Sequence, residues 1–216
     1  MVKTVFFDPL CPFAWRGLEL LNALNIEFDA RAYSLHQGNH AANTVLNRGE
    51  PVWKIAELPL EELTDVQRLS LDSFIALAAA RHQGTAKHHH FALELMRAKH
   101  QAKLEFGAEV FESAAQKAGL NLEQFKTDFA NTGARRHEIA KDLDSADEIA
   151  VFGTPTVVLE SGNAAYFRFA NLPTDPEAQQ QLWDLYVAVL ENPARIETIK
   201  RPRKVVTPNT VYQVKN

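Results

Sequence analysis

The sequence predicts an α/β fold in which a block of helices interrupts a small sheet domain. Three observations lead to this prediction. Segments rich in β-branched and aromatic residues lie near both ends of the chain, the stretch from Leu63 to Ile149 lacks proline and is rich in Ala, Leu, Glu, Lys and Gln, and the single cysteine, Cys11, directly follows the first strand-like segment. The first composition is typical of strands and the second of helices.

The N-terminal part reads as a βαβ unit. Val2 to Phe7 is β-branched and aromatic, and Ile26 to Leu35 alternates in part between apolar and polar residues, so both are predicted strands. A helix from Pro12 to Ala23 joins them. Gln37 to Glu50 is rich in Gly and Asn, which indicates an irregular connection.

The middle of the chain is expected to hold four or five helices. Thr64 with Gln67, and Asn121 with Gln124, have the spacing of a capping box. Glycines predict helix ends or breaks at four places, Gly84, Gly107, Gly119 and Gly133.

The C-terminal part predicts a hairpin followed by a closing helix. A strand over Thr156–Leu159 leads into a turn at Ser161–Asn163 and a second strand over Ala165–Phe169. Asp175, before Pro176 and an acidic first turn, is a typical N-cap for a helix that runs to about Glu191.

We therefore expect one discontinuous domain made of residues 1–50 and 150–195. Residues 51–149 form a helical insertion, and residues 196–216, including the Arg201-Pro202-Arg203-Lys204 run, form an extended tail.

Cys11 is the leading candidate for a catalytic group. A strand that ends in Cys-Pro and turns into a helix places the sulfur at the helix N-terminus, where unpaired N–H groups and the helix dipole favour a thiolate. The alternative is a buried structural thiol, since free cysteine is often found in protein interiors. Ala14 stands where a dithiol motif has its second cysteine, so any redox cycle must use a second thiol from outside the chain.

Composition narrows the function classes. The net charge of −4, from 23 basic and 27 acidic residues, does not indicate a nucleic-acid or anionic-membrane partner. No apolar run approaches the roughly 20 residues that cross a bilayer. A lone cysteine excludes an internal disulfide framework, and the N-terminus reads as a strand and not as a secretion signal, so we expect a cytoplasmic protein.

The order of elements resembles that of the DsbA-like branch of the thioredoxin superfamily. Two motifs share the resemblance, Cys11-Pro12-Phe13-Ala14 and Gly153-Thr154-Pro155-Thr156. The segments around both motifs look most like the cytoplasmic members, including mycothiol-dependent nitroreductases. Kappa-class glutathione transferases and 2-hydroxychromene-2-carboxylate isomerases are similar too, but carry serine in place of Cys11.

The resemblance implies a thioredoxin-like fold with a helical insertion and a thiol-dependent oxidoreductase. It also implies that Pro155 is cis and faces the sulfur of Cys11, which leaves the backbone of Thr154 to pair with an extended thiol substrate. The expected catalytic residue is Cys11. The expected substrate-binding and thiol-binding residues are Pro12, Phe13, Ala14, Trp15, Thr154, Pro155 and Arg168.

Several of these residues also have simpler interpretations. Trp15, one turn into the helix, fits a core position better than a substrate groove. Arg168 could grip a carboxylate of a glutathione-like thiol or be a solvated strand residue. Asp8 fits a turn residue before Pro9 better than a buried carboxylate, and it receives no catalytic role.

No metal site is expected. Several histidines lie in the helical block, but none has the carboxylate and spacing of a known zinc pattern, so a polar helix face is the simpler interpretation. They include His82, His88, His89, His90 and His100.

Three hypotheses remain at this point. The first is monothiol exchange through Cys11 with a low-molecular-weight thiol, of mycothiol or glutathione type, acting on a small-molecule or protein disulfide. The second is a glutathione-transferase-like or isomerase-like reaction without net redox change. The third is a catalytically inactive ligand-binding protein. Family analogy is compatible with a homodimer.

Overall fold

The computed structural model describes residues 1–43 and 49–200. Four strands form one sheet in the order β2-β1-β3-β4. β1 (Val2–Phe7) pairs parallel to β2 (Asp29–Ala32) and antiparallel to β3 (Thr156–Leu159), and β3 pairs antiparallel to β4 (Ala164–Tyr166). Within β1, Val5 and Phe7 belong to the main hydrophobic core, whereas Phe6 belongs to a second, smaller cluster.

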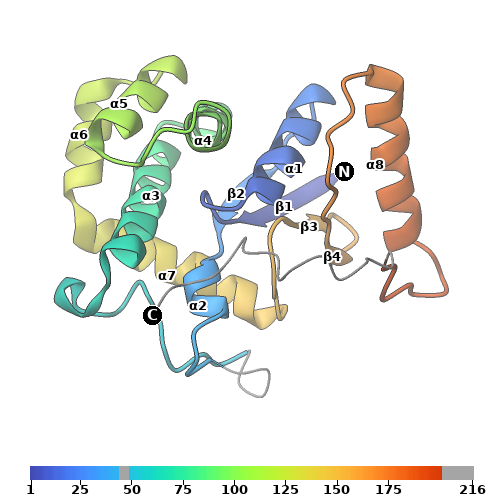
Figure 1. The fold of residues 1–216 in the computed structure, drawn as a ribbon, viewed down its shortest axis with the longest axis horizontal. Helices are drawn as coiled ribbons and strands as arrows, with labels where there is room; N and C mark the ends of the chain where they lie inside the picture. Colours follow the sequence, from blue (N-terminus) through green and yellow to red (C-terminus); the bar gives the residue numbers. More distant parts are fainter. Residues whose placement is uncertain (44–48, 201–216) are drawn as a thin grey trace.

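Helices surround this sheet (Figure 1). α1 (Pro12–Ala23) packs against both α8 (Pro176–Leu190) and α4 (Thr85–His100), whereas α7 (Thr132–Glu148) packs against β2. The helices α3 (Asp65–Arg81), α4, α5 (Ala108–Lys117) and α6 (Leu122–Ala130) gather on one side of the sheet, opposite α8. The predicted α/β class with a helical block inside it is confirmed. The domain boundaries stay a prediction.

The helix ends follow the predicted local signals. Thr64 and Gln67 form a reciprocal capping box at the start of α3, and Asn121 accepts the N–H of Gln124 at the start of α6. Asp175 caps α8 by accepting the N–H of Ala178. The five helices α3 to α7 agree with the expected four or five.

Two predicted strands are longer than the observed ones. β2 begins only at Asp29, since Asn25 takes a positive φ of 52° just after α1. It ends at Ala32, since Ser34 caps a short helix, α2 (Leu35–Gly38), by accepting the N–H of Gln37. A helical turn therefore also occupies the beginning of the predicted irregular connection. A single-turn 3₁₀ helix, η2 (Leu60–Glu62), precedes α3.

β4 ends at Tyr166, three residues before the predicted end of the strand. Beyond it the N–H of Phe167 still donates to the carbonyl of Pro155 at 3.0 Å, and the Phe167 ring packs on Tyr186 of α8 with ring centroids 4.3 Å apart. One backbone hydrogen bond and side-chain packing therefore hold this segment. Residues 196–200 carry no helix or strand and are exposed. The rest of the predicted tail, 201–216, lies outside the described residues.

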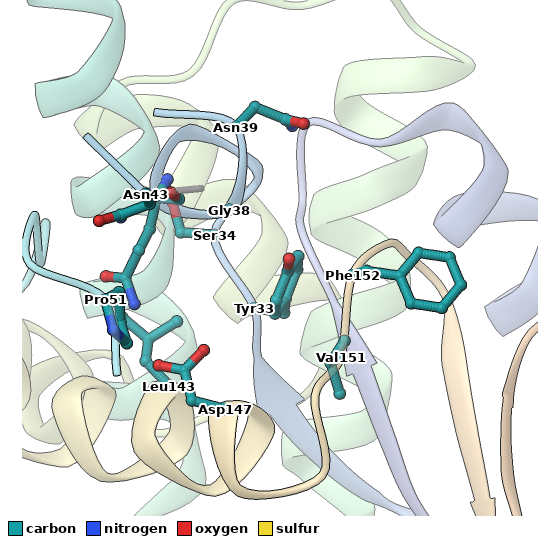
Figure 2. A pocket seen from close by; sticks show the side chains of 11 residues that line it. Tyr33, Ser34, Gly38, Asn39, Asn43, Pro51, Leu143, Asp147, Val151 and Phe152 are labelled. Carbon is teal, nitrogen blue, oxygen red and sulfur yellow. Dashed lines mark hydrogen bonds between the residues drawn. The ribbon is translucent and has the colours of Figure 1, made fainter. Parts of the chain in front are cut away.

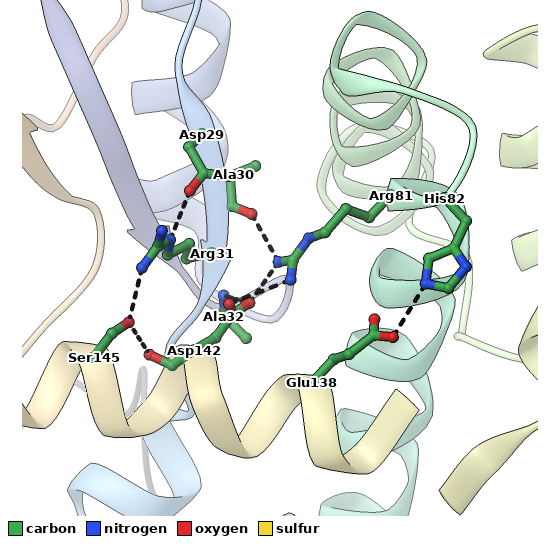
Figure 3. A network of polar contacts seen from close by, with 9 residues as sticks. All are labelled: Asp29, Ala30, Arg31, Ala32, Arg81, His82, Glu138, Asp142 and Ser145. Carbon is green, nitrogen blue, oxygen red and sulfur yellow. Dashed lines mark hydrogen bonds and ion pairs between the residues drawn. The ribbon is translucent and has the colours of Figure 1, made fainter. Parts of the chain in front are cut away.

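An ion pair protects the outer edge of β2 (Figure 3). Arg81 of α3 donates to Asp142 of α7 at 2.5 Å and to the carbonyl of Ala30 at 3.1 Å, and Asp142 accepts the N–H of Ala32 at 3.0 Å. These side chains satisfy edge groups that a further strand would otherwise pair. The same contacts fasten the helical block to the sheet.

We predict that Asp142→Ala lowers the free energy of unfolding by about 3 kcal/mol, because it removes the counter-ion of Arg81 and leaves the buried N–H of Ala32 without its acceptor. Urea titration followed by circular dichroism measures the effect. Asp144→Ala on the same helix is the matched control. It breaks an exposed ion pair with Lys54 and should cost less than about 1 kcal/mol. Equal losses in the two variants would contradict the prediction.

Candidate active site

Cys11 sits at the N-cap of α1. Its φ and ψ of −90° and 113° are extended, Pro12 occupies the first helical turn, and Sγ accepts the N–H of Ala14 at 3.5 Å. The N–H of Cys11 donates to the carbonyl of Asp8 at 2.9 Å, which closes the turn between β1 and α1. The sulfur thus lies at the positive end of a 12-residue helix, as the sequence predicts.

The distant Thr154-Pro155 segment meets this sulfur. The Thr154–Pro155 peptide bond is cis, and the thiol of Cys11 donates to the carbonyl of Thr154 at 3.4 Å across 143 residues of sequence. Thr154 is 2% exposed, and its hydroxyl is buried with no hydrogen-bond partner. Two of the residues expected at the site are therefore in direct contact.

Gly17 makes this approach possible. A Cβ built on Gly17 would lie 2.7 Å from Cγ of Pro155, closer than two carbon atoms can pack. The proline ring therefore rests on the bare backbone of α1. Sequence reasoning missed this glycine, and no local signal could have found it because its partner is far along the chain.

The sulfur itself has little access to solvent. Cys11 is 2% exposed and Ala14 is fully buried, whereas Pro12 and Phe13 are half-buried. A reagent therefore reaches Sγ only when neighbouring side chains move aside.

Trp15 lies at the contact between α1 and α4. Its indole stacks on the ring of His100, with centroids 5.9 Å apart, and donates Nε1–H to Glu19 at 3.0 Å. Arg97 of α4 holds both carboxylate oxygens of Glu19 at 2.7 Å. These contacts favour the packing interpretation of Trp15.

Arg168 lies over the ring of Phe13, with Cζ 4.5 Å from the ring centroid. Arg16 approaches the same ring at 5.3 Å. The structure thus brings Arg168, predicted from the hairpin, to the helix that carries Cys11. Arg16 was missed, although its i+3 spacing from Phe13 on one helix is a usable signal.

Asp8 is completely buried beneath the turn that carries Cys11. Its carboxyl accepts the N–H groups of Leu10 and Leu35, each at 2.8 Å. The hydrogen bond to Leu10 is typical of a turn residue, whereas the hydrogen bond to Leu35 connects the turn to the start of α2. Burial raises the pKa of Asp8 to about 6, against the lowering effect of the two hydrogen bonds.

The expectation that the histidines form a polar helix face is wrong for two of them. His88 is 3% and His100 is 8% exposed, because both face inward from α4. Burial lowers the pKa of His88 to about 3 and that of His100 to about 4. His100 Nε2 contacts the carbonyl of Pro9 at 2.8 Å, which adds a second support for the Cys11 turn. No cluster of three potential metal ligands occurs among the residues that the structure describes.

A cavity of about 450 Å³ lies between α2, α7 and the segment before Thr154, and none of the site residues predicted from the sequence lines it (Figure 2). Tyr33, Ser34 and Gly38 line it from the end of β2 and α2, and Val151 and Phe152 from the segment before Thr154. Asp147 of α7 points into it, and burial together with the charge of Asp144 raises the pKa of Asp147 to about 6. Sequence reasoning did not find this cavity, because its walls come from separate parts of the chain.

The family model described as Thioredoxin matches residues 4–167, which is more than half of the chain. The chain is 28% identical over 178 residues to the ClpXP adapter protein SpxH of Halalkalibacterium halodurans, an alignment that covers 73% of this chain and 58% of that relative. The chain therefore spans less than two thirds of the length of that relative.

Two solved structures share the fold. A protein described as a probable DsbA oxidoreductase from Streptomyces coelicolor is 16% identical with a TM-score of 0.55, and the match covers 85% of this chain and 91% of that one. The cytosolic disulfide reductase DsbM from Pseudomonas aeruginosa, solved with GSH, is 15% identical with a TM-score of 0.52, covering 86% and 99%. In the described part of the present chain, no helix is both long and apolar enough to span a membrane.

We predict that Gly17→Ala destabilises the protein by about 1 to 3 kcal/mol, because the new methyl group must displace Pro155. The displacement should also break the contact between Cys11 and Thr154 and so raise the rate at which iodoacetamide alkylates Cys11. Urea titration and mass spectrometry measure the two effects. Gly133→Ala is the control, since its Cβ would meet nothing within 4 Å. A Gly17→Ala variant as stable as the Gly133→Ala control would show that the Pro155 ring does not pack closely against Gly17.

The buried carboxyl of Asp8 should make stability depend on pH. Its pKa is raised in the folded state, so folding binds protons, and stability falls as the pH rises from about 4 to about 6. Between those limits, the stability of Asp8→Asn relative to wild type should shift in favour of the variant by up to about 3 kcal/mol. Urea titration across this range measures the difference. Asp184→Asn, the same change of side chain at an exposed position, is the matched control, and a flat profile for Asp8→Asn would contradict the prediction.

Proposed function

The chain belongs to the thioredoxin family and has the DsbA-like arrangement with a helical insertion, and from this premise we propose that it is a thiol–disulfide oxidoreductase-like enzyme. Cys11 is the nucleophile, and a low-molecular-weight thiol of glutathione or mycothiol type is its co-substrate. The observation that carries the proposal is the position of Cys11, at a helix N-terminus and in contact with the residue before cis Pro155.

The proposed reaction has two exchange steps. The Cys11 thiol first loses its proton to solvent, and the N–H of Ala14 and the helix dipole stabilise the thiolate. The thiolate attacks one sulfur of a disulfide, whose S–S bond breaks to leave a mixed disulfide on Cys11 and a free thiolate. A second small thiol then attacks the mixed disulfide and regenerates Cys11. The external thiol is needed because Ala14 offers no sulfur.

The residues around Cys11 fit a small thiol substrate. The unpaired hydroxyl of Thr154 is a buried group that a ligand could satisfy, and Arg168 is exposed beside Phe13. In this proposal Thr154 and Pro155 face the substrate backbone, Pro12 and Phe13 flank it, and Arg168 binds a carboxylate. Trp15 shapes the site from the side of α4.

The rest of the proposal concerns the setting of the enzyme. A chain with one cysteine suits a reducing compartment, so we place it in the cytoplasm, with a small-molecule or protein disulfide as the second substrate. The net charge of −4 supports neither a nucleic-acid nor an anionic-membrane partner. A homodimer rests on family analogy alone.

The decisive experiment follows reduction of bis(2-hydroxyethyl) disulfide by glutathione. We expect turnover by the wild type and a mixed disulfide on Cys11, seen as the added mass of one thiol in a spectrum taken without reductant. Cys11→Ser should retain less than about 1% of the activity and form no adduct, since a hydroxyl is a far weaker nucleophile.

Ala14→Cys supplies a further control. It restores a second sulfur at the position of a resolving cysteine, so the adduct on Cys11 should be released as an internal disulfide and should not accumulate. Wild-type protein that neither turns over nor forms an adduct would overturn the proposed function.

A second candidate is a reaction without net redox change, of the glutathione-transferase or isomerase kind. The observation that favours it is Ala14, which removes the internal redox partner. Product analysis with glutathione and an electrophile separates the two, because a thioether indicates transfer and glutathione disulfide indicates redox chemistry.

A third candidate is a binding protein without catalytic activity. The 2% exposure of Cys11 favours it, and the SpxH relative is named as an adapter, although the chain spans only part of that protein. Unchanged ligand affinity in Cys11→Ser, together with no turnover by the wild type, would identify this case.

A further inference from the structure

Two arginines flank the aromatic ring nearest in sequence to the candidate nucleophile. Phe13 lies two residues after Cys11, and its ring has Arg168 at 4.5 Å and Arg16 at 5.3 Å. Arg16 belongs to the first turns of α1 and Arg168 to the segment after β4. The fold therefore assembles two positive charges from distant parts of the chain beside one ring.

Neither guanidinium is neutralised within residues 1–43 and 49–200. Arg16 and Arg168 form none of the ion pairs found there, whereas Arg97 on the neighbouring helix is held by Glu19 and Glu94. Moreover, Nη1 of Arg16 is buried and has no hydrogen-bond partner. A buried charged donor without an acceptor is costly, so an incoming carboxylate would gain more here than at a solvated arginine.

Other positive groups lie near the Cys11 turn. His100, which contacts the carbonyl of Pro9, has a pKa of about 4, lowered first by burial and then by the charges of Lys103, Lys99 and Arg16. These side chains therefore lie close enough to His100 to disfavour its positive charge, and of them Lys99 is paired with Glu105. A positive charge left unpaired beside the Cys11 turn, such as that of Arg16, attracts anionic substrates.

We propose that Arg16 and Arg168 select, among the disulfides and thiols that exchange with Cys11, those that carry a carboxylate. The inference rests on the proposed thiol exchange and names its substrate class. The arginines touch the substrate away from the sulfur atoms, so the exchange itself is unchanged. The Cys11 thiolate attacks one sulfur, the S–S bond breaks, and the leaving thiolate takes a proton from solvent. Glutathione, with two free carboxylates, belongs to this class. Mycothiol does not, because its cysteinyl carboxyl forms an amide.

The test compares three small symmetric disulfides of similar length but different charge. They are 3,3′-dithiodipropionate, which is anionic, bis(2-hydroxyethyl) disulfide, which is neutral, and cystamine, which is cationic. Mass spectrometry follows the rate of mixed-disulfide formation on Cys11 near neutral pH and low salt. We expect the anionic probe to react about tenfold faster than the neutral one and the cationic probe to react slowest, with the preference shrinking at high salt.

Variants assign the preference to the two arginines. Arg168→Gln and Arg16→Gln should each reduce the ratio of the anionic to the neutral rate by severalfold. Arg68→Gln, an equal loss of charge at an exposed position of α3, should leave that ratio as it is. Arg168 is exposed, so its variant remains informative even if Arg16→Gln fails to fold.

The outcomes separate this inference from the proposed function. If all three probes react with Cys11 at equal rates, or if the preference survives in Arg168→Gln, the carboxylate selection is wrong and thiol exchange stands. If no probe reacts with Cys11 in folded protein, the proposed function fails and the inference fails with it.

Discussion

The close packing of Pro155 on Gly17 is the constraint on which the candidate site depends. Because Gly17 has no side chain, the ring can lie against α1, and the carbonyl of Thr154 then comes within 3.4 Å of the Cys11 sulfur. Any larger residue at position 17 would separate the two segments. Cys11 and the backbone of Thr154 are thus positioned by one steric contact between elements far apart in the chain.

Buried polar groups hold the turn that carries Cys11 in place. The carboxyl of Asp8 accepts the N–H of Leu35 and so connects this turn to α2. From α4, His100 forms a hydrogen bond with the carbonyl of Pro9. The helical block is in turn fastened to the sheet by Arg81 and Asp142, which complete the edge of β2 (Figure 3). The helical block therefore contributes to the site as well as to the core, since His100 of α4 holds the turn that carries Cys11. Removing one partner from such a buried network is costly, because it leaves another polar group without its hydrogen bond.

The sequence predicted elements well where the signals are local. Caps at Thr64, Asn121 and Asp175 form as expected, because each depends on side chains within three residues of a helix start. It overestimated β2 and β4, whose lengths depend on neighbours. β2 ends where Ser34 starts a helical turn, and β4 ends where Phe167 turns to pack on α8.

The sequence by itself determined the class of fold, the place of Cys11 at a helix start and the lack of a second cysteine, because these depend on residues adjacent in the chain. Only the tertiary structure decided that Cys11 is 2% exposed, that Gly17 admits Pro155, and that Arg168 joins Arg16 at the ring of Phe13. Each of these facts depends on contacts between segments far apart in the chain. Such contacts follow from how whole elements pack, which no local pattern encodes.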